Sequence, residues 1–263
     1  MKFLFIGAGK MGGAILESLI TSKTAKPSEI TVFEANAERV SQLVKTFKVK
    51  AATSFETAVA GADVVFIAVK PQDLGNMLSQ IKTNTPFFIS IAAGKTTAWL
   101  ESVLPPRSRV VRAMPNLALS AGAGMTGFCA GSRATKSDLR LATRIFSGAG
   151  KTIVLPESQF DALTALSGSG PAFFAYFLQA MTDAGAALGF DHETAATLAT
   201  QTFLGTALVL SGSGTTPAEF MQAVASPKGT TAAGLEVLGK STLRGIVAKT
   251  LAAAAKRSKQ LNK

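Results

Sequence analysis

The run Gly7-Ala8-Gly9-Lys10-Met11-Gly12 constrains the fold of this chain more than any other feature. It directly follows an apolar run, Lys2 to Ile6, and it opens a segment, Met11 to Thr21, whose apolar residues recur at helical spacing. A glycine-rich turn between a strand and a helix is the context that the dinucleotide-binding fingerprint requires. The sequence therefore predicts a cofactor-binding strand, turn and helix within residues 2–21.

The glycines of this run have distinct expected roles. Gly7 allows the tight turn, Gly9 lets a pyrophosphate approach the backbone, and Gly12 lets the helix pack closely on the strand. The helix N-terminus offers N–H groups to the phosphates. Glu34, at the end of the second predicted strand, is placed to bind the ribose 2′-hydroxyl and would favour NAD, whereas nearby Arg39 could meet the 2′-phosphate of NADP. The choice between NADH and NADPH stays open at this point.

Short apolar runs alternate with amphipathic segments through residues 1–156. Near-continuous apolar strands alternating with helices are typical of a parallel sheet covered on both faces. The predicted fold class is α/β, with an N-terminal Rossmann-type, doubly wound and mostly parallel sheet. Further strands are expected at Ile30–Phe33, Asp63–Val69, Phe87–Ile91, Val110–Met114 and Ile153–Leu155, and helices at Ala37–Phe47, Gln72–Ile81, Thr97–Leu104 and Lys136–Phe146.

The sequence changes character after Pro156. β-branched runs disappear, and Ala, Leu and Met recur at intervals of three and four residues, which predicts an all-α domain. We therefore expect a dinucleotide-binding Rossmann domain over residues 1–156 and a helical domain over residues 157–263. Wide apolar faces on so small a domain favour burial against a second subunit. Its helices are expected at Ala172–Leu188, Glu193–Leu210, Pro217–Val224, Thr231–Leu238 and Leu243–Leu261.

Composition argues against several classes of partner. The 27 Lys and Arg against 16 Asp and Glu give a net charge of +11, which favours anionic ligands. The basic residues are scattered and there is one Trp and one Tyr to stack on bases, so we expect no nucleic-acid partner. No apolar run reaches the roughly 18 to 20 residues that span a bilayer, and no signal-peptide pattern is present, so we expect a cytoplasmic protein without a membrane partner. A single histidine and a single cysteine argue against a metal site and a disulfide.

Four local features look chemical but favour structural roles. The run from Gly148 to Thr152 resembles the end of a phosphate-binding loop, yet it precedes a predicted strand instead of following one. The run from Ser167 to Gly170 resembles a nucleophile elbow but lacks its first glycine. His192 is expected to be a solvated imidazole at a helix start, and Cys129 a small apolar filler in a β-like stretch. The reaction should therefore need no strong general base.

Five remaining segments are rich in glycine, serine and proline: Ala68–Gln72, Ser90–Gly94, Arg112–Asn116, Leu166–Phe173 and Ser226–Leu235. The first three fall at the carboxyl ends of predicted strands, where open α/β sheets bind ligands. The fifth offers a run of N–H groups and hydroxyls suited to a small carboxylate.

With these segments in this order and spacing, the chain resembles the pyrroline-5-carboxylate reductase family essentially end to end. The Ser-Pro-Lys-Gly-Thr-Thr run at 226–231 and the Leu-Ser-Gly-Ser-Gly-Pro-Ala-Phe run at 166–173 are the specific signals. The resemblance implies reduction of the C=N bond of 1-pyrroline-5-carboxylate to L-proline by NADPH or NADH, the last step of proline biosynthesis. It also implies that the Rossmann domain is followed by a helical substrate-binding and dimerisation domain over residues 157–263, in homodimers that often form rings.

The resemblance also implies a role for each matching residue. The cofactor pyrophosphate would be held by Ile6, Gly7, Ala8, Gly9, Lys10 and Met11. The nicotinamide side would be lined by Ala68, Val69, Lys70, Pro71, Ala92, Ala93 and Gly94. The substrate carboxylate would be bound by Ser226, Gly229, Thr230 and Thr231, with the Thr231 hydroxyl reaching the imine nitrogen as the catalytic group. A protonated cyclic imine is already electrophilic, so positioning would supply most of the catalysis.

Three positions depart from the family's usual pattern. Leu117 stands where a threonine is usual, Lys228 replaces a common glycine of the carboxylate loop, and Glu34 is acidic where many members are neutral or basic. Lys228 either strengthens carboxylate binding through its charge or points into solvent, and the sequence favours neither.

Two other functions compete with this interpretation. Two-domain reductases of the 3-hydroxyacid or ketopantoate type normally place a catalytic lysine in a helix of the second domain, but residues 172–210 contain no lysine. A dinucleotide sensor or nucleic-acid-binding protein that has lost catalysis would have no need of the carboxylate loop.

Overall fold

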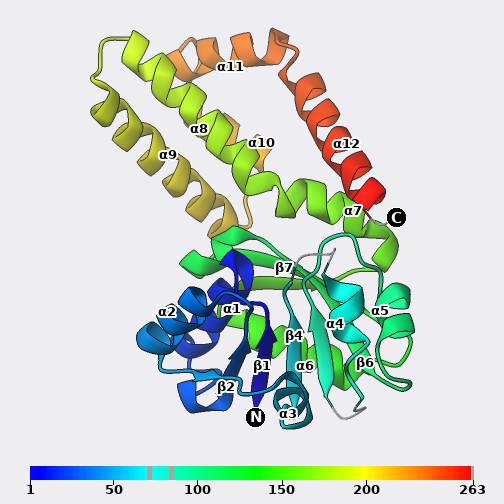
Figure 1. Ribbon diagram of the computed structural model, residues 1–263. Helices are drawn as coiled ribbons and strands as arrows, with labels where there is room; N and C mark the ends of the chain where they lie inside the picture. Colours follow the sequence, from blue (N-terminus) through cyan, green and yellow to red (C-terminus); the bar gives the residue numbers. More distant parts are fainter. Residues whose placement is uncertain (70–72, 83–85, 262–263) are drawn as a thin grey trace. The chain divides into compact units, whose positions relative to one another are not determined.

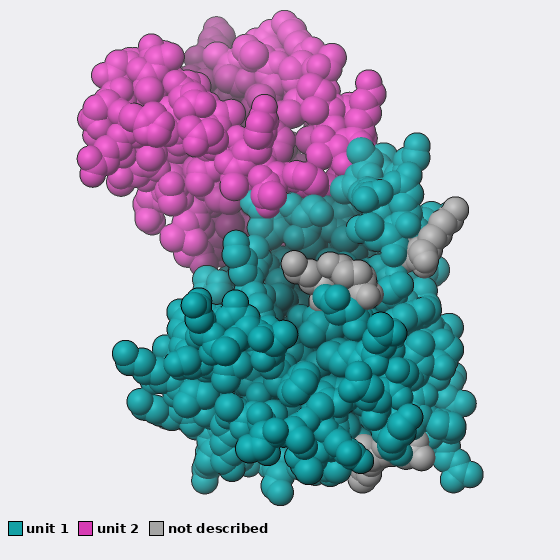
Figure 2. All heavy atoms as spheres, viewed as in Figure 1, with its two compact units in different colours: residues 1–171, 252–263 teal, residues 172–251 magenta. Residues whose placement is uncertain are grey.

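The structure is a computed structural model that describes residues 1–69, 73–82 and 86–261. The chain forms two compact units, one of residues 1–171 with 252–263 and one of residues 172–251 (Figure 2). Both crossings between the units lie inside helices, α8 (Gly170–Ala187) and α12 (Leu243–Leu261). The functional division expected between residues 156 and 157 stays a prediction.

An eight-stranded sheet runs through the first unit in the order β3-β2-β1-β4-β5-β6-β7-β8 (Figure 1). Neighbouring strands pair in parallel except β6 and β7, which are antiparallel. Strand order reverses beside β1, which makes the sheet doubly wound and confirms the predicted fold class. The strands are β1 Phe3–Ile6, β2 Ile30–Phe33, β3 Lys50–Ala51, β4 Val64–Ile67, β5 Phe87–Ser90, β6 Arg109–Pro115, β7 Gly124–Ala130 and β8 Gly150–Val154.

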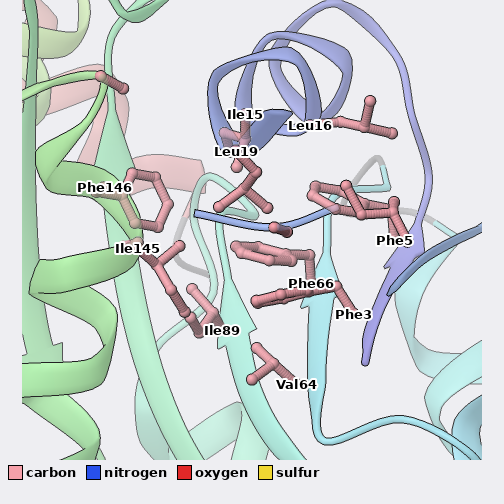
Figure 3. Close-up of a cluster of buried hydrophobic side chains, with 14 of the residues drawn as sticks. Phe3, Phe5, Ile15, Leu16, Leu19, Val64, Phe66, Ile89, Ile145 and Phe146 are labelled. Atoms are coloured by element: carbon pink, nitrogen blue, oxygen red, sulfur yellow. The ribbon is translucent and has the colours of Figure 1, made fainter. Parts of the chain in front are cut away.

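Helices cover both faces of this sheet because the strands are apolar on both sides. In β1, Phe3 and Phe5 join a core cluster with α1, α2 and α6, whereas Leu4 and Ile6 join a second cluster with α3, α4 and α5. The Phe5 and Phe66 rings stack with centroids 4.5 Å apart in the first cluster (Figure 3). These helices are α1 Lys10–Thr21, α2 Ala37–Phe47, α3 Phe55–Ala60, α4 Leu74–Leu78, α5 Thr97–Val103 and α6 Lys136–Ser147.

Two of the elements that the sequence did not predict are short. β3 has two residues and α3 has six, too few for a clear hydrophobic period. The strand β7 was expected only as a β-like stretch around Cys129. The last strand runs from Gly150 to Val154, earlier than the expected Ile153–Leu155.

The second unit is helical, as its alanine and leucine spacing predicts. Asp191 caps α9 by accepting a hydrogen bond from the Thr194 N–H at 2.8 Å, and Gly189 follows α8 with a φ of +108°, which glycine adopts easily at a helix end. The remaining helices of this region are α9 His192–Ser213, α10 Pro217–Val224 and α11 Thr230–Lys240, with short α7 Phe160–Leu163 preceding α8.

Side chains in the second unit are largely exposed. Within residues 172–251, all of which the structure describes, only Thr182 and Ala195 are buried. Large apolar side chains such as Tyr176, Met181 and Leu188 are mostly exposed, at 77%, 66% and 85%. A unit with so little interior leaves its apolar helix faces to be covered by something other than itself.

Candidate active site

The turn from β1 into α1 accepts only glycine at two of its positions. Gly7 has a φ of +85°, and a Cβ there would lie 2.7 Å from Val69 Cγ1 and 2.8 Å from the Ala68 carbonyl carbon. A Cβ on Gly12 would lie 2.7 Å from the Gly7 carbonyl oxygen. Local sterics therefore explain the tight turn at Gly7 and the close approach of α1 to the strand ends at Gly12.

Gly9 is different because its surroundings are open. It is the N-cap of α1 with a φ of −62°, and a Cβ there would meet no atom within 4 Å. No described side chain caps α1, and its first turn contains no acidic residue. An uncapped helix N-terminus beside unfilled space suits an anionic pyrophosphate. The residues of this turn therefore fit a dinucleotide cofactor.

Glu34 closes the side of the turn that would face the adenosine ribose. Its carboxylate accepts hydrogen bonds from the Ala8 N–H at 2.8 Å and from the Asn36 N–H at 3.1 Å. The Arg39 guanidinium donates to the Ala8 carbonyl at 2.9 Å and to Gln42 Oε1 at 2.7 Å. A fixed negative charge therefore stands at the end of β2, and Arg39 is already engaged by two acceptors.

Two of the predicted nicotinamide-lining segments lie at the carboxyl edge of the sheet. Ala68 and Val69 follow β4 and contact the Gly7 turn, so they lie against the expected pyrophosphate site. Ala92, Ala93 and Gly94 follow β5, where Gly94 has a φ of +74°. Lys70 and Pro71 lie outside the described residues. The structure thus brings Ala68 and Val69 together with the glycine turn.

The candidate segment Arg112–Asn116 contacts the segment Leu166–Phe173 at a short π-helix, Thr164–Gly168. Asn116 Nδ2, after β6, donates to the Ser167 carbonyl at 3.2 Å, and Asn116 Oδ1 accepts from the Met125 N–H at 3.2 Å. A Cβ on Gly168 would lie 2.7 Å from Met114 Cε. The specific Leu-Ser-Gly-Ser-Gly run is therefore packed against the end of β6, and π-turns of this kind recur at functional sites.

Near this edge lies an ion pair between the buried Arg112 and the half-buried Glu157, which the sequence did not predict. Glu157 accepts hydrogen bonds from Arg112 Nη1 at 2.9 Å, from the Thr97 N–H at 2.8 Å and from Thr97 Oγ1 at 2.7 Å. Burial alone would raise the pKa of the Glu157 carboxyl, but the bonds from Arg112 and Thr97 outweigh burial and hold that pKa below its usual value. Arg112 also lies over the Phe160 ring, 4.8 Å from its centroid.

Cys129 lies near this pair, and its thiol is unreactive at neutral pH. Burial, and then the Glu157 charge, raise the pKa of its thiol to about 12. Since the thiolate is the reactive form, Cys129 is not a nucleophile at neutral pH, and the structure supports the interpretation as a filler. His192 is exposed, with its Nε2 3.8 Å from Asp183 Oδ1.

The candidate substrate loop lies in the second unit and ends in an uncapped helix. The Gly229 N–H donates to the Ser226 carbonyl at 3.0 Å, which closes a four-residue turn with Pro227 and Lys228 in its centre. Lys228 has a φ of +58°, the left-handed conformation that glycine adopts most easily. Gly229 is the N-cap of α11, and a Cβ there would overlap Ser226 Oγ.

The N-termini of α1 and α11 differ from those of most other helices in this chain. Neither receives a side-chain hydrogen bond from the described residues, and neither has an acidic residue in its first turn. By contrast, a side chain caps each of α2, α3, α5, α6, α9 and α10. The two helices expected to bind anions are thus among those whose first N–H groups no described side chain caps, a feature that they share with the five-residue helix α4.

Sequence reasoning found the segments of the site but missed the residues that join them. Asn116 and Arg112 stood in a candidate segment without a role, and Glu157 was not considered. Glu157 lies 45 residues from Arg112 and 60 residues from Thr97 along the chain, and Asn116 lies 51 residues from Ser167. No local sequence pattern therefore marks these contacts.

Within residues 1–69, 73–82 and 86–261, no group of three or more His, Cys, Asp or Glu side chains could hold a metal ion. None of the described helices is long and apolar enough to cross a membrane.

Comparison with known proteins gives matches over both halves of the chain. Residues 157–261 match the family described as "Pyrroline-5-carboxylate reductase dimerisation", and residues 2–94 match the family "NADP oxidoreductase coenzyme F420-dependent". A pyrroline-5-carboxylate reductase from Methanosarcina acetivorans is 38% identical over 265 residues, covering 100% of this chain and 98% of the relative. One from Synechocystis is 38% identical over 260 residues, covering 98% and 97%.

Solved structures give the same result. A pyrroline-5-carboxylate reductase from Coxiella burnetii superposes with a TM-score of 0.93 at 34% identity, covering 100% of this chain and 98% of the other. A pyrroline carboxylate reductase from Plasmodium falciparum, solved with NADP bound, has a TM-score of 0.89 at 27% identity, with coverage of 100% and 98%.

Proposed function

The chain belongs to the pyrroline-5-carboxylate reductase family, and from this membership we propose how its own residues carry out the reaction. The reaction is an NAD(P)H-dependent reduction in proline biosynthesis, in which the C=N bond of 1-pyrroline-5-carboxylate becomes the C–N bond of L-proline. The two uncapped helix N-termini, one for the cofactor phosphates and one for the substrate carboxylate, are the observation that carries the proposal.

The residues of the β1–α1 turn bind and orient the cofactor. Ile6, Gly7, Ala8, Gly9, Lys10 and Met11 surround the pyrophosphate, whose charge is matched by the N-terminus of α1. Ala68 and Val69, with Ala92, Ala93 and Gly94, line the nicotinamide, and Lys70 and Pro71 are proposed to complete this wall. When bound, the reduced nicotinamide supplies the hydride.

The residues of the Ser226–Thr231 loop orient the imine acid. Ser226, Gly229, Thr230 and Thr231 present hydroxyls and the first N–H groups of α11 to the substrate carboxylate. The Thr231 hydroxyl holds the imine nitrogen by a hydrogen bond. Because the protonated imine is already electrophilic, holding it in place is the main catalytic contribution, which agrees with the exposed His192 and the unreactive Cys129.

We expect Thr231→Ala to lower kcat/KM for the imine acid. The loss of transition-state stabilisation should be roughly 1 to 3 kcal/mol, as for loss of one hydrogen bond to a polarised group. Thr231→Ser keeps the hydroxyl and should retain most of the activity. Steady-state kinetics of the three proteins test the assignment. Equal kcat/KM values for wild type and Thr231→Ala would assign the hydroxyl a structural role only.

Lys228 is proposed to attract the substrate carboxylate from the edge of the same loop. We expect Lys228→Gly to raise KM for the imine acid about 2- to 5-fold with little change in kcat, the size expected of an exposed charge pair. Lys48→Gly is the matched control, because Lys48 has the same φ of +58° but caps α2. An unchanged KM in Lys228→Gly would mean that its charge points into solvent.

Glu34 is proposed to make NADH the better cofactor. Its carboxylate is fixed at the end of β2, where a 2′-phosphate would meet a like charge. We expect kcat/KM for NADH to exceed that for NADPH, and Glu34→Gln to reduce this ratio by about tenfold while keeping an acceptor for the Ala8 N–H. A ratio that is the same in wild type and Glu34→Gln would exclude Glu34 from cofactor selection.

The assembly is proposed to be a homodimer formed through the second unit. Its exposed apolar helix faces and the match of residues 157–261 to a dimerisation family support this. Light scattering coupled to size exclusion measures the assembly and tests whether dimers form a larger ring. A cytoplasmic location and the functional boundary at residues 156 and 157 are further parts of the proposal.

A further inference from the structure

The last turn of α12 belongs to the same compact unit as the Rossmann sheet. Residues 252–263 group with residues 1–171, although the first half of α12 groups with the second unit. The final described turn, Ser258 to Leu261, contacts residues of the 1–171 segment at two places. Neither contact joins two strands of the sheet, so neither follows from strand pairing.

The first contact is with the turn that follows β5. Gly94 is buried and has a φ of +74°, and a Cβ on it would lie 2.5 Å from the Leu261 carbonyl oxygen and 2.8 Å from the Leu261 carbonyl carbon. The backbone of α12 therefore lies directly on Gly94. Only a glycine allows this approach, since any side chain would push the helix away.

The second contact fastens the same helical turn from the side. Ser258 is 7% exposed, and its hydroxyl donates to Asp161 Oδ1 at 2.7 Å. Asp161 lies in α7, next to Phe160, whose ring lies under the buried Arg112. The end of α12 is thus tied to α7, and α7 contacts Arg112 of the Arg112–Glu157 ion pair through Phe160.

Together the two contacts hold the β5–α5 turn between the sheet and a helix that comes from the other end of the sequence. We propose that the last turn of α12 is a positioning element for Ala92–Gly94, with Ser258 as the positioning residue. It keeps the backbone of that turn at a fixed place beside the nicotinamide. The inference rests on the proposed function, because only that function makes Ala92–Gly94 part of the active site.

A positioning role and a purely structural role lead to different expectations. A helix end that only adds stability would change the unfolding midpoint and leave turnover by the folded protein unchanged. A helix end that holds Ala92–Gly94 would slow the hydride step and leave the cofactor bound, because the pyrophosphate is held elsewhere, at the Gly7–Gly12 turn.

The test compares Ser258→Ala with Thr250→Ala. Thr250 lies in the same helix, but its hydroxyl donates to the Ile246 carbonyl inside that helix, at 2.9 Å. The readouts are kcat with the imine acid, the Kd of NADH from fluorescence, and hydrogen–deuterium exchange of residues 91–96 in the cofactor-free protein. A chain ending at Gln260, compared with one ending at Leu261, removes the Leu261 contact itself.

We expect Ser258→Ala and the chain ending at Gln260 to lose about 5- to 10-fold in kcat, with the Kd of NADH changed less than 2-fold. Exchange in residues 91–96 should be faster than in Thr250→Ala, which should match wild type. Wild-type kcat and exchange in both variants would overturn the positioning role while leaving the proposed function intact. Failure of the wild-type protein to reduce the imine acid would overturn both.

Discussion

Replacing Glu157 by alanine is expected to lower the free energy of unfolding by about 3 to 5 kcal/mol. The loss would be large because Arg112 is nearly buried, with 4% of its side chain exposed, and would be left as an uncompensated charge. The Thr97 N–H and hydroxyl would lose their acceptor in the same change. Three hydrogen bonds to one half-buried carboxylate would be lost together.

Chemical denaturation at fixed protein concentration measures this effect, since assembly would otherwise shift the midpoint. Glu17→Ala, an exposed acid on α1, is the control and should change the free energy of unfolding by less than about 0.5 kcal/mol. A loss below about 1 kcal/mol in Glu157→Ala would show that the ion pair adds little.

The same pair predicts a pH dependence. The pKa of Glu157 is lower in the folded protein than in the unfolded chain, so its stabilisation is present above the unfolded-state pKa and is lost as pH falls through the folded-state pKa. The difference in unfolding free energy between wild type and Glu157→Ala should therefore narrow as pH falls below about 4.5, the ordinary pKa of a glutamate, and through the lower pKa of the folded protein. A difference that is constant over this range would contradict the assignment.

Gly9→Ala is expected to weaken cofactor binding by about 100-fold or more while leaving the fold as stable as before. Its φ of −62° is one that alanine adopts freely, and its Cβ would meet no protein atom within 4 Å. The methyl group would instead occupy space that the pyrophosphate needs. A 100-fold loss corresponds to about 2.7 kcal/mol of binding free energy.

Two other glycines make this prediction specific. Gly75→Ala, also in open surroundings, should change neither cofactor binding nor stability by much. Gly7→Ala should reduce both, because its φ of +85° and the nearby Ala68 backbone do not accept a side chain. Titration of protein fluorescence with NADH gives the three dissociation constants. Wild-type affinity in Gly9→Ala would place the pyrophosphate away from this turn.

The parts of the fold that the sequence predicts are those with a strong local pattern. The β1 strand is apolar at every position from Phe3 to Ile6, and the following glycines have steric reasons that can be stated in advance. The two-residue β3 has no such pattern, because its register is set by β2 beside it. Tertiary pairing, not local preference, makes it a strand.

The candidate site divides in the same way. The glycine turn and the Ser226–Thr231 loop are readable from sequence because they work through backbone conformation. The Glu157–Arg112 pair and the Ser258–Asp161 bond are not, because they join residues 45 and 97 positions apart. Lys228 is different again. The sequence shows a lysine where a glycine is common, and the φ of +58° shows that the backbone there keeps the left-handed conformation that suits glycine.

The most direct test of this account is turnover by the purified wild-type protein. Racemic 1-pyrroline-5-carboxylate is mixed with NADH and, in parallel, with NADPH, and the loss of nicotinamide absorbance is followed. We predict rapid oxidation that is confined to the imine acid, gives proline as product, and is faster with NADH. Tight binding of both cofactors with no oxidation of either would contradict the account and favour a dinucleotide sensor.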